Sequence, residues 1–122
     1  MRKVAVLALC SLLLATVACS PIEKQAYNTI VAAKAFLDSE KKVHSECPAA
    51  GTTLCQNLSR ATAAKDALID AAEIYCSSPA FESGGACTPP AKGTPASDQA
   101  IAKLKAAIAT YNQLEKDVRG SL

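Results

Sequence analysis

Residues 53–76 decide the fold, and they read TLCQNLSRATAAKDALIDAAEIYC. Apolar side chains recur there every three or four residues, which is the spacing of one face of an α-helix. Thr53 followed by Gln56 is a capping-box pattern, and Ser77-Ser78-Pro79 ends the periodic stretch. We therefore predict a helix over 54–76 that starts at a Thr53 cap. Its buried face should comprise Leu54, Leu58, Ala61, Leu68, Ala72 and Tyr75.

The cysteines at the two ends of this helix restrict the disulfide pairing. Cys55 and Cys76 are 21 residues apart, which places them about 31 Å apart along a helix. A disulfide needs α-carbons within about 7 Å, so these two cannot pair. The crossed pairing would also join opposite ends of the bundle. The remaining pairing, Cys47–Cys55 with Cys76–Cys87, closes one interhelical connection at each end.

A second helix is predicted before this stretch, over 21–45. Ser20-Pro21-Ile22-Glu23 combines a cap residue, a proline at the first helical position and a glutamate three residues after the cap. Cys47-Pro48 ends the pattern. The apolar stripe of this helix is Ile22, Ala26, Ile30, Ala33, Leu37 and Val43.

A third helix is predicted over 96–119, starting at Thr94-Pro95 or at Ser97 and ending at a Gly120 C-cap. Residues 77–95 hold repeated prolines and glycines, so we expect a loop there, with Phe81 as a candidate contact residue. Alternating strand patterns are absent from the sequence. The prediction is an all-α, three-helix, up-down-up bundle with a thin, alanine-rich core. The stripe of the third helix is Ile101, Leu104, Ile108, Tyr111 and Val118.

Residues 1–18 have the pattern of a signal peptide. Arg2 and Lys3 are followed by an apolar run over 4–14 and by small residues up to Ala18. The run is shorter than the about 20 residues that a membrane-spanning helix needs. We therefore expect cleavage after Ala18, which leaves residues 19–122 as one domain.

The segment Ala15-Thr16-Val17-Ala18-Cys19 resembles the lipobox of bacterial lipoproteins, although Thr16 stands where leucine is usual. The resemblance covers the signal alone. It implies that Cys19 becomes the N-terminus and carries acyl chains such as palmitate, which anchor the domain to a membrane. Ser20 in place of aspartate implies the outer membrane, facing the periplasm. Ordinary signal peptidase would cut at the same position and give a secreted or periplasmic protein.

Charge and cysteine content fit an exported domain. Arg2 and Lys3 are the only charged residues in the signal, so residues 19–122 carry 11 basic and 11 acidic side chains. This neutrality does not favour nucleic-acid binding. With Cys10 in the signal and Cys19 acylated, an even set of four cysteines remains, as is typical of disulfides in an oxidising compartment.

Catalytic and metal-binding patterns are weak. His44 is the sole histidine, and we interpret it as a solvent-facing residue in the last turn of its helix. Asp66, Asp70 and Glu73 share one helix face, which we interpret as solvated rather than as a proton-sharing or cation site. The cysteines lack the close pairing of zinc sites. We predict no catalytic residues, metal or cofactor.

The sequence thus favours a non-enzymatic lipoprotein of the cell envelope that acts as a structural or protein-interaction module. Its expected contacts are the membrane, through the acyl anchor, and an envelope protein. The alternative is a periplasmic bundle that binds a small molecule or lipid in an apolar gap between alanine-rich helices.

Overall fold

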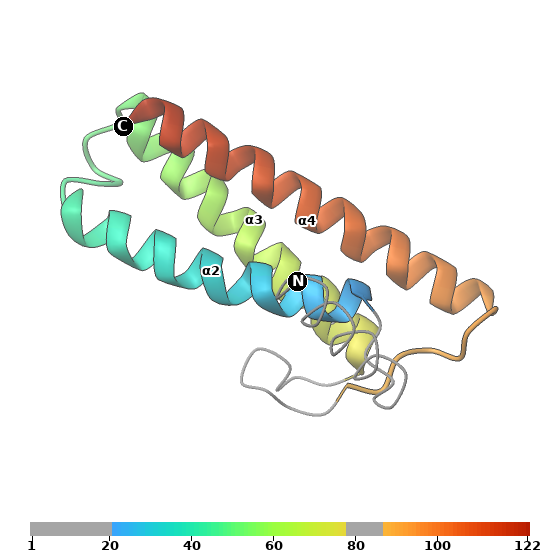
Figure 1. Cartoon of the computed structure of the whole chain (residues 1–122). Helices are drawn as coiled ribbons and strands as arrows, with labels where there is room; N and C mark the ends of the chain where they lie inside the picture. The colour runs from blue at the N-terminus through green and yellow to red at the C-terminus, as the bar shows by residue number, and fades with distance from the viewer. Residues whose placement is uncertain (1–20, 78–86) are drawn as a thin grey trace, which may run out of the picture.

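The computed structural model describes residues 21–77 and 87–122, and these form a bundle of three antiparallel helices (Figure 1). The helices are α2 (Pro21–Val43), α3 (Thr53–Cys76) and α4 (Pro95–Ser121). Consecutive helices run in opposite directions, so the predicted all-α, up-down-up architecture is confirmed. The predicted signal peptide, Cys19 and Phe81 lie outside the described residues.

The N-terminal caps of α3 and α4 are both threonines. Thr94 has extended backbone and its Oγ1 accepts a hydrogen bond from the Ser97 amide at 3.2 Å, with Pro95 at the first helical position. This confirms the Thr94-Pro95 start. The predicted Thr53 cap of α3 is wrong by one residue, because Thr52 has the extended backbone and its Oγ1 accepts from the Cys55 amide at 3.2 Å.

Two predicted helix ends also require correction. Helix α2 ends at Val43 rather than at residue 45, and turns follow over 44–50. Val43 is 69% exposed, so the buried stripe of α2 ends at Leu37. Gly120 does not end α4, which continues to Ser121.

The continuation of α4 has a structural cause on α3. The Asn57 amide of α3 donates hydrogen bonds to the Asp117 carbonyl oxygen at 3.3 Å and to Ser121 Oγ at 2.6 Å. Ser121 Oγ in turn donates to the Asp117 carbonyl at 2.7 Å. These bonds satisfy polar groups in the last turn of α4, which therefore stays helical across Gly120.

The core is narrow and lies along the axis of the bundle. Helices α3 and α4 share the largest interface, and α2 packs mainly on α3. Alanines contribute to the buried face of α2 and α3, as predicted, while leucine, isoleucine and tyrosine fill most of the volume. The fully buried residues include Ala26, Ile30, Ala33, Leu37, Ala61, Leu68, Ala72, Leu104, Tyr111 and Val118.

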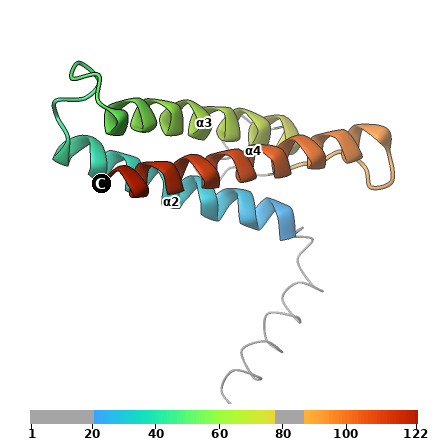
Figure 2. The same cartoon turned by 90° about the horizontal axis from the view of Figure 1, so that it is seen from above.

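The start of α4 projects beyond the other two helices. Asn57 of α3 contacts the last turn of α4. Between this contact and Pro95, α4 contains more residues than α3 contains between Asn57 and Cys76. At 1.5 Å per residue the difference is about 5 Å when counted from Asp117 and about 10 Å when counted from Ser121, which is roughly one to two helical turns. Figures 1 and 2 both show this end of α4 extending past the start of α2 and the end of α3.

Candidate functional site

Two disulfides join the two ends of α3 to the neighbouring connecting segments, with the pairing predicted from the sequence. Cys47 and Cys55 have α-carbons 5.1 Å apart and join the chain after α2 to the first turn of α3. Cys76 and Cys87 have α-carbons 4.3 Å apart and join the end of α3 to the chain before α4. The Thr88 amide also donates to the Cys76 carbonyl at 2.8 Å. Both interhelical connections are therefore closed covalently.

A surface hollow of about 440 Å³ lies beside the Cys47–Cys55 disulfide. Its apolar lining comprises Leu58, Ala63 and Pro48, of which only Leu58 is buried, together with the two cysteines of the disulfide. Lys41 of α2 and Asp66 of α3 contribute opposite charges to its lining, and Ser59 and Thr62 supply hydroxyl groups. The hollow is large enough for a small ligand or for side chains of another protein.

The two charged residues that line this hollow differ in their ion pairs within the part of the chain that the structure describes. Asp66 forms an ion pair with Lys65, with Lys65 Nζ and Asp66 Oδ1 3.1 Å apart. The ion pairs formed among residues 21–77 and 87–122 do not include Lys41. A ligand in the hollow would therefore meet an available ammonium group at Lys41 and a carboxylate already offset at Asp66.

Glu46, Cys47 and Cys55 form the one grouping, within the described ranges, whose potential metal-ligand atoms lie within 4.8 Å of one another. The two sulfurs are bonded to each other in the disulfide. Thiolates, not disulfide sulfurs, bind metals strongly. One carboxylate then remains, which is too few ligands for a structural metal site.

His44 follows the last residue of α2 and lies between two carboxylates. Its Nε2 is 3.5 Å from Glu40 Oε2, and its Nδ1 is 3.4 Å from Glu46 Oε1. Only 22% of its side chain is exposed, so His44 is partly buried rather than solvent-facing as predicted. Its amide still donates to the Glu40 carbonyl at 2.8 Å, which agrees with the predicted position at the end of the helix. The two glutamates hold the ring in place at the start of the 44–50 turns.

The carboxylate face of α3 agrees more closely with the solvated interpretation. Asp66 and Asp70 are exposed, and Glu73 is partly buried. Asp66 pairs with Lys65 on the same helix. These three residues are not among the clustered potential ligands found in the part of the chain that the structure describes.

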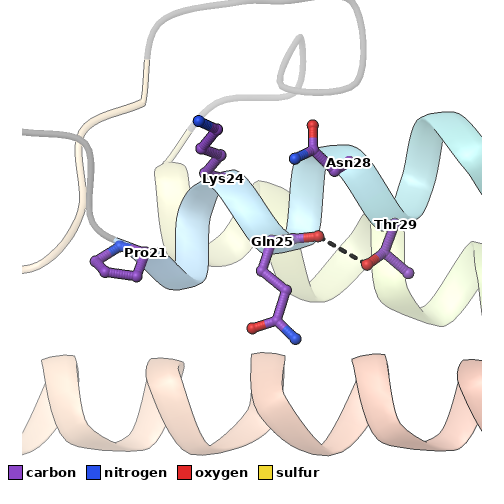
Figure 3. A pocket seen from close by; sticks show the side chains of 5 residues that line it. All are labelled: Pro21, Lys24, Gln25, Asn28 and Thr29. Carbon is purple, nitrogen blue, oxygen red and sulfur yellow. Dashed lines mark hydrogen bonds between the residues drawn. The ribbon is translucent and has the colours of Figure 1, made fainter. Parts of the chain in front are cut away.

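A second hollow, of about 380 Å³, lies along the first two turns of α2 (Figure 3). Pro21, Lys24, Gln25, Asn28 and Thr29 line it. Gln25 points toward α4, while Lys24 and Asn28 point to the other side of α2. Thr29 Oγ1 donates to the Gln25 carbonyl at 2.7 Å, so its hydroxyl proton is already used.

A connected set of side chains joins α4 to α2. The buried Tyr111 hydroxyl donates to Glu115 Oε1 at 3.0 Å, and Arg119 Nε lies 3.5 Å from Glu115 Oε2. The Arg119 guanidinium then lies over the ring of Phe36 on α2. Burial, followed by the Glu115 hydrogen bond and charge, raises the pKa of Tyr111 above its ordinary value. Tyr111 therefore remains a proton donor to Glu115.

Several of these features were not found from the sequence. The i, i+4 spacing of Tyr111, Glu115 and Arg119 was readable, but the partner Phe36 lies on a distant segment. The role of Asn57 likewise depends on a contact across 64 residues.

Comparison with known protein families finds no matching family model, and comparisons with curated proteins and with solved structures find no match either.

Proposed function

We propose that the chain is a lipid-anchored protein of the bacterial cell envelope that acts as a non-enzymatic interaction module for another envelope protein. The observation that supports this most directly is the pairing of all four cysteines that follow Cys19. Disulfides persist in oxidising compartments outside the cytoplasm. The paired cysteines therefore agree with the export that the signal-like residues 1–18 indicate.

The proposed anchor is Cys19, in the lipobox-like segment directly before α2. None of the described helices has the length and hydropathy needed to cross a membrane. In our proposal the attachment is made by acyl chains on Cys19, which together hold a protein stably on a bilayer. The outer membrane, on its periplasmic side, is the proposed location because Ser20 follows the cysteine.

The proposed contact for a protein partner is the hollow beside Cys47–Cys55. The Cys47–Cys55 disulfide and residues of α3 line it, and a mainly apolar lining with a few polar groups is typical of recognition sites. Lys41 offers an ammonium group to an acidic side chain of the partner. The described residues offer His44 as the sole histidine, and its neighbours are carboxylates rather than a nucleophile.

Intact mass and site-specific crosslinking in living cells test this function. Membrane-extracted protein should have the mass of residues 19–122 plus acyl chains, and Cys19→Ser should abolish the increment. A photo-crosslinking amino acid at Ser59, in the hollow, should give one discrete adduct with an envelope protein. The same group at Lys116, exposed on α4, is the matched control. Equal labelling from both positions, or none from Ser59, would contradict the proposed contact.

The hollow also favours a second function, the binding of a small apolar molecule with an anionic group. Its volume of about 440 Å³ falls in the range of small-ligand sites. It is a hollow at the surface, lined by residues of α2, α3 and the turns between them. The sequence had suggested an apolar gap between the alanine-rich helices. Native mass spectrometry of the purified domain would separate the two functions, because a carrier retains a bound molecule and Lys41→Ala should release it.

A further inference from the structure

The short link between the proposed anchor and α2 restricts how the bundle can lie on a membrane. Cys19 is two residues before Pro21, the first residue of α2. Two extended residues span at most about 7 Å. If Cys19 is acylated, as proposed above, the start of α2 must therefore lie very close to the bilayer surface.

The start of α2 is fixed to the rest of the bundle. Ala26 and Ile30 are fully buried in the shared core, within the first three turns of α2. Separating these turns from α3 and α4 would expose this apolar surface to water. The anchor consequently positions the whole bundle and not α2 alone.

Helix α4 starts on the same side of the bundle and projects farther. Its overhang beyond α3 is about 5–10 Å, which is comparable to the full reach of the two-residue link. Figures 1 and 2 show that it also passes the start of α2. When the start of α2 is held at the bilayer, the first turns of α4 therefore reach the level of the headgroups.

We infer that the exposed first turns of α4 rest on the bilayer that holds the Cys19 acyl chains, with the bundle inclined and the Cys47–Cys55 end directed away. The proposed occupant of this surface is the lipid headgroup region. Pro95, Ala96, Gln99 and Ala102 are exposed there, and Asp98 is the single charged residue among positions 95–102. These exposed positions hold none of the large apolar side chains that insert a surface helix into hydrocarbon, so the proposed contact is with the headgroups alone.

The opposite end of the bundle then lies far from the membrane. Helix α2 has 23 residues, which corresponds to about 34 Å. The Cys47–Cys55 disulfide and its hollow follow the far end of α2. Inclining the bundle brings this end closer to the bilayer surface but does not bring it into contact with the bilayer. This arrangement leaves the hollow open to a protein in the periplasm.

Photo-crosslinking to lipid tests the orientation. Full-length protein, acylated in cells, is reconstituted into vesicles of phosphatidylethanolamine with a minor fraction of phosphatidylglycerol. Benzophenone groups are placed at Ala96, in the first turn of α4, or at Ala49, in the turns near the distal disulfide; both positions are exposed. We expect at least a tenfold higher yield of phospholipid adducts from Ala96. A label at Ala106, exposed in the middle of α4, should give an intermediate yield.

Amide hydrogen exchange provides a second measurement without substitutions. On vesicles, exchange in peptides covering 92–100 should be slower than in detergent, while exchange in peptides covering 44–52 should not change.

In the crosslinking experiment, equal lipid labelling from Ala49 and Ala96, or stronger labelling from Ala49, overturns the orientation.

The intact mass, measured on each preparation, separates the two failures. A chain without acyl groups refutes the proposed anchor and the orientation with it. An acylated chain whose Ala96 label does not reach lipid refutes the orientation alone.

Discussion

The guanidinium carbon of Arg119 lies 4.3 Å from the centre of the Phe36 ring, which connects the last turns of α4 to α2. Helices α2 and α4 share a much smaller interface than α3 and α4 do. A cation over an aromatic face is attracted by the negative charge density of the ring. This one contact is therefore a larger part of the α2–α4 interaction than it would be in a broad interface.

The Arg119–Phe36 contact should be measurable in a double-mutant cycle. Arg119 is 57% exposed in its side chain, so solvent screens the interaction and we expect a coupling of about 0.5–1 kcal/mol. Urea unfolding of Arg119→Ala, Phe36→Leu and the double variant would give this value. Arg60→Ala, an exposed arginine on α3, is the control and should change the free energy of unfolding by less than about 0.5 kcal/mol. A coupling of zero would contradict the role given to Arg119.

Truncating Leu68 should be strongly destabilising. Leu68 is fully buried in the core cluster, and replacing a buried leucine with alanine costs about 2–5 kcal/mol. Ile74→Ala on the same helix is a matched control, because Ile74 is 68% exposed. Its effect should remain within about 0.5 kcal/mol. Similar losses from the two variants would mean that α3 presents a different face to the core.

Removing the Cys47–Cys55 disulfide should lower the free energy of unfolding, mainly because it increases the conformational entropy of the unfolded chain. The bridge closes a segment with a sequence separation of 8, for which loop-closure entropy gives about 2.5 kcal/mol. The paired variant Cys47→Ser with Cys55→Ser should show this loss in urea unfolding. Cys76→Ser with Cys87→Ser, at a separation of 11, should show a slightly larger one. A peptide linking Cys55 to Cys87 in a non-reducing digest would exclude the three-helix packing.

Asn57→Ala should loosen the end of α4. The variant removes two hydrogen bonds to the last turn, and each such bond contributes about 1 kcal/mol. Amide exchange at residues 118–122 should accelerate more than exchange near Leu104. Asn112→Ala, exposed on α4, should leave both regions unchanged, and an unchanged C-terminus in Asn57→Ala would refute the docking contact.

Stability should fall in alkaline solution because of Tyr111. Its pKa is raised in the folded state by burial and then by Glu115. Above the ordinary tyrosine pKa of about 10, the unfolded chain loses this proton more readily than the folded one, so unfolding is favoured as pH rises. Urea unfolding between about pH 8 and pH 11.5 should show the decline, and Tyr111→Phe should reduce its slope. An equal slope in both proteins would assign the effect to other groups.

The sequence was most informative where a pattern depends on neighbours in the chain. Helical period, the Thr94-Pro95 start and the disulfide pairing all follow from local spacing, and the structure confirms them. The errors occur where distant segments decide the outcome. Gly120 had the position of a C-cap, but Asn57 on α3 keeps the last turn helical. Val43 had helical spacing, but α2 ends there and leaves it exposed.

The candidate site was predictable only in part for the same reason. The cysteines that border the hollow were identified, but its lining combines α2, the following turns and one face of α3. Two adjacent threonines made the α3 cap ambiguous by one residue. The orientation of each backbone, rather than residue type, decided between Thr52 and Thr53.

The closure of both connections has a consequence for the way in which the protein responds to proteolysis. A peptide bond cut between Cys47 and Cys55 divides the polypeptide, yet the bridge still holds both fragments. The same holds for a cut between Cys76 and Cys87. A nicked molecule should thus keep its assembled shape and separate into pieces only after a reductant is added.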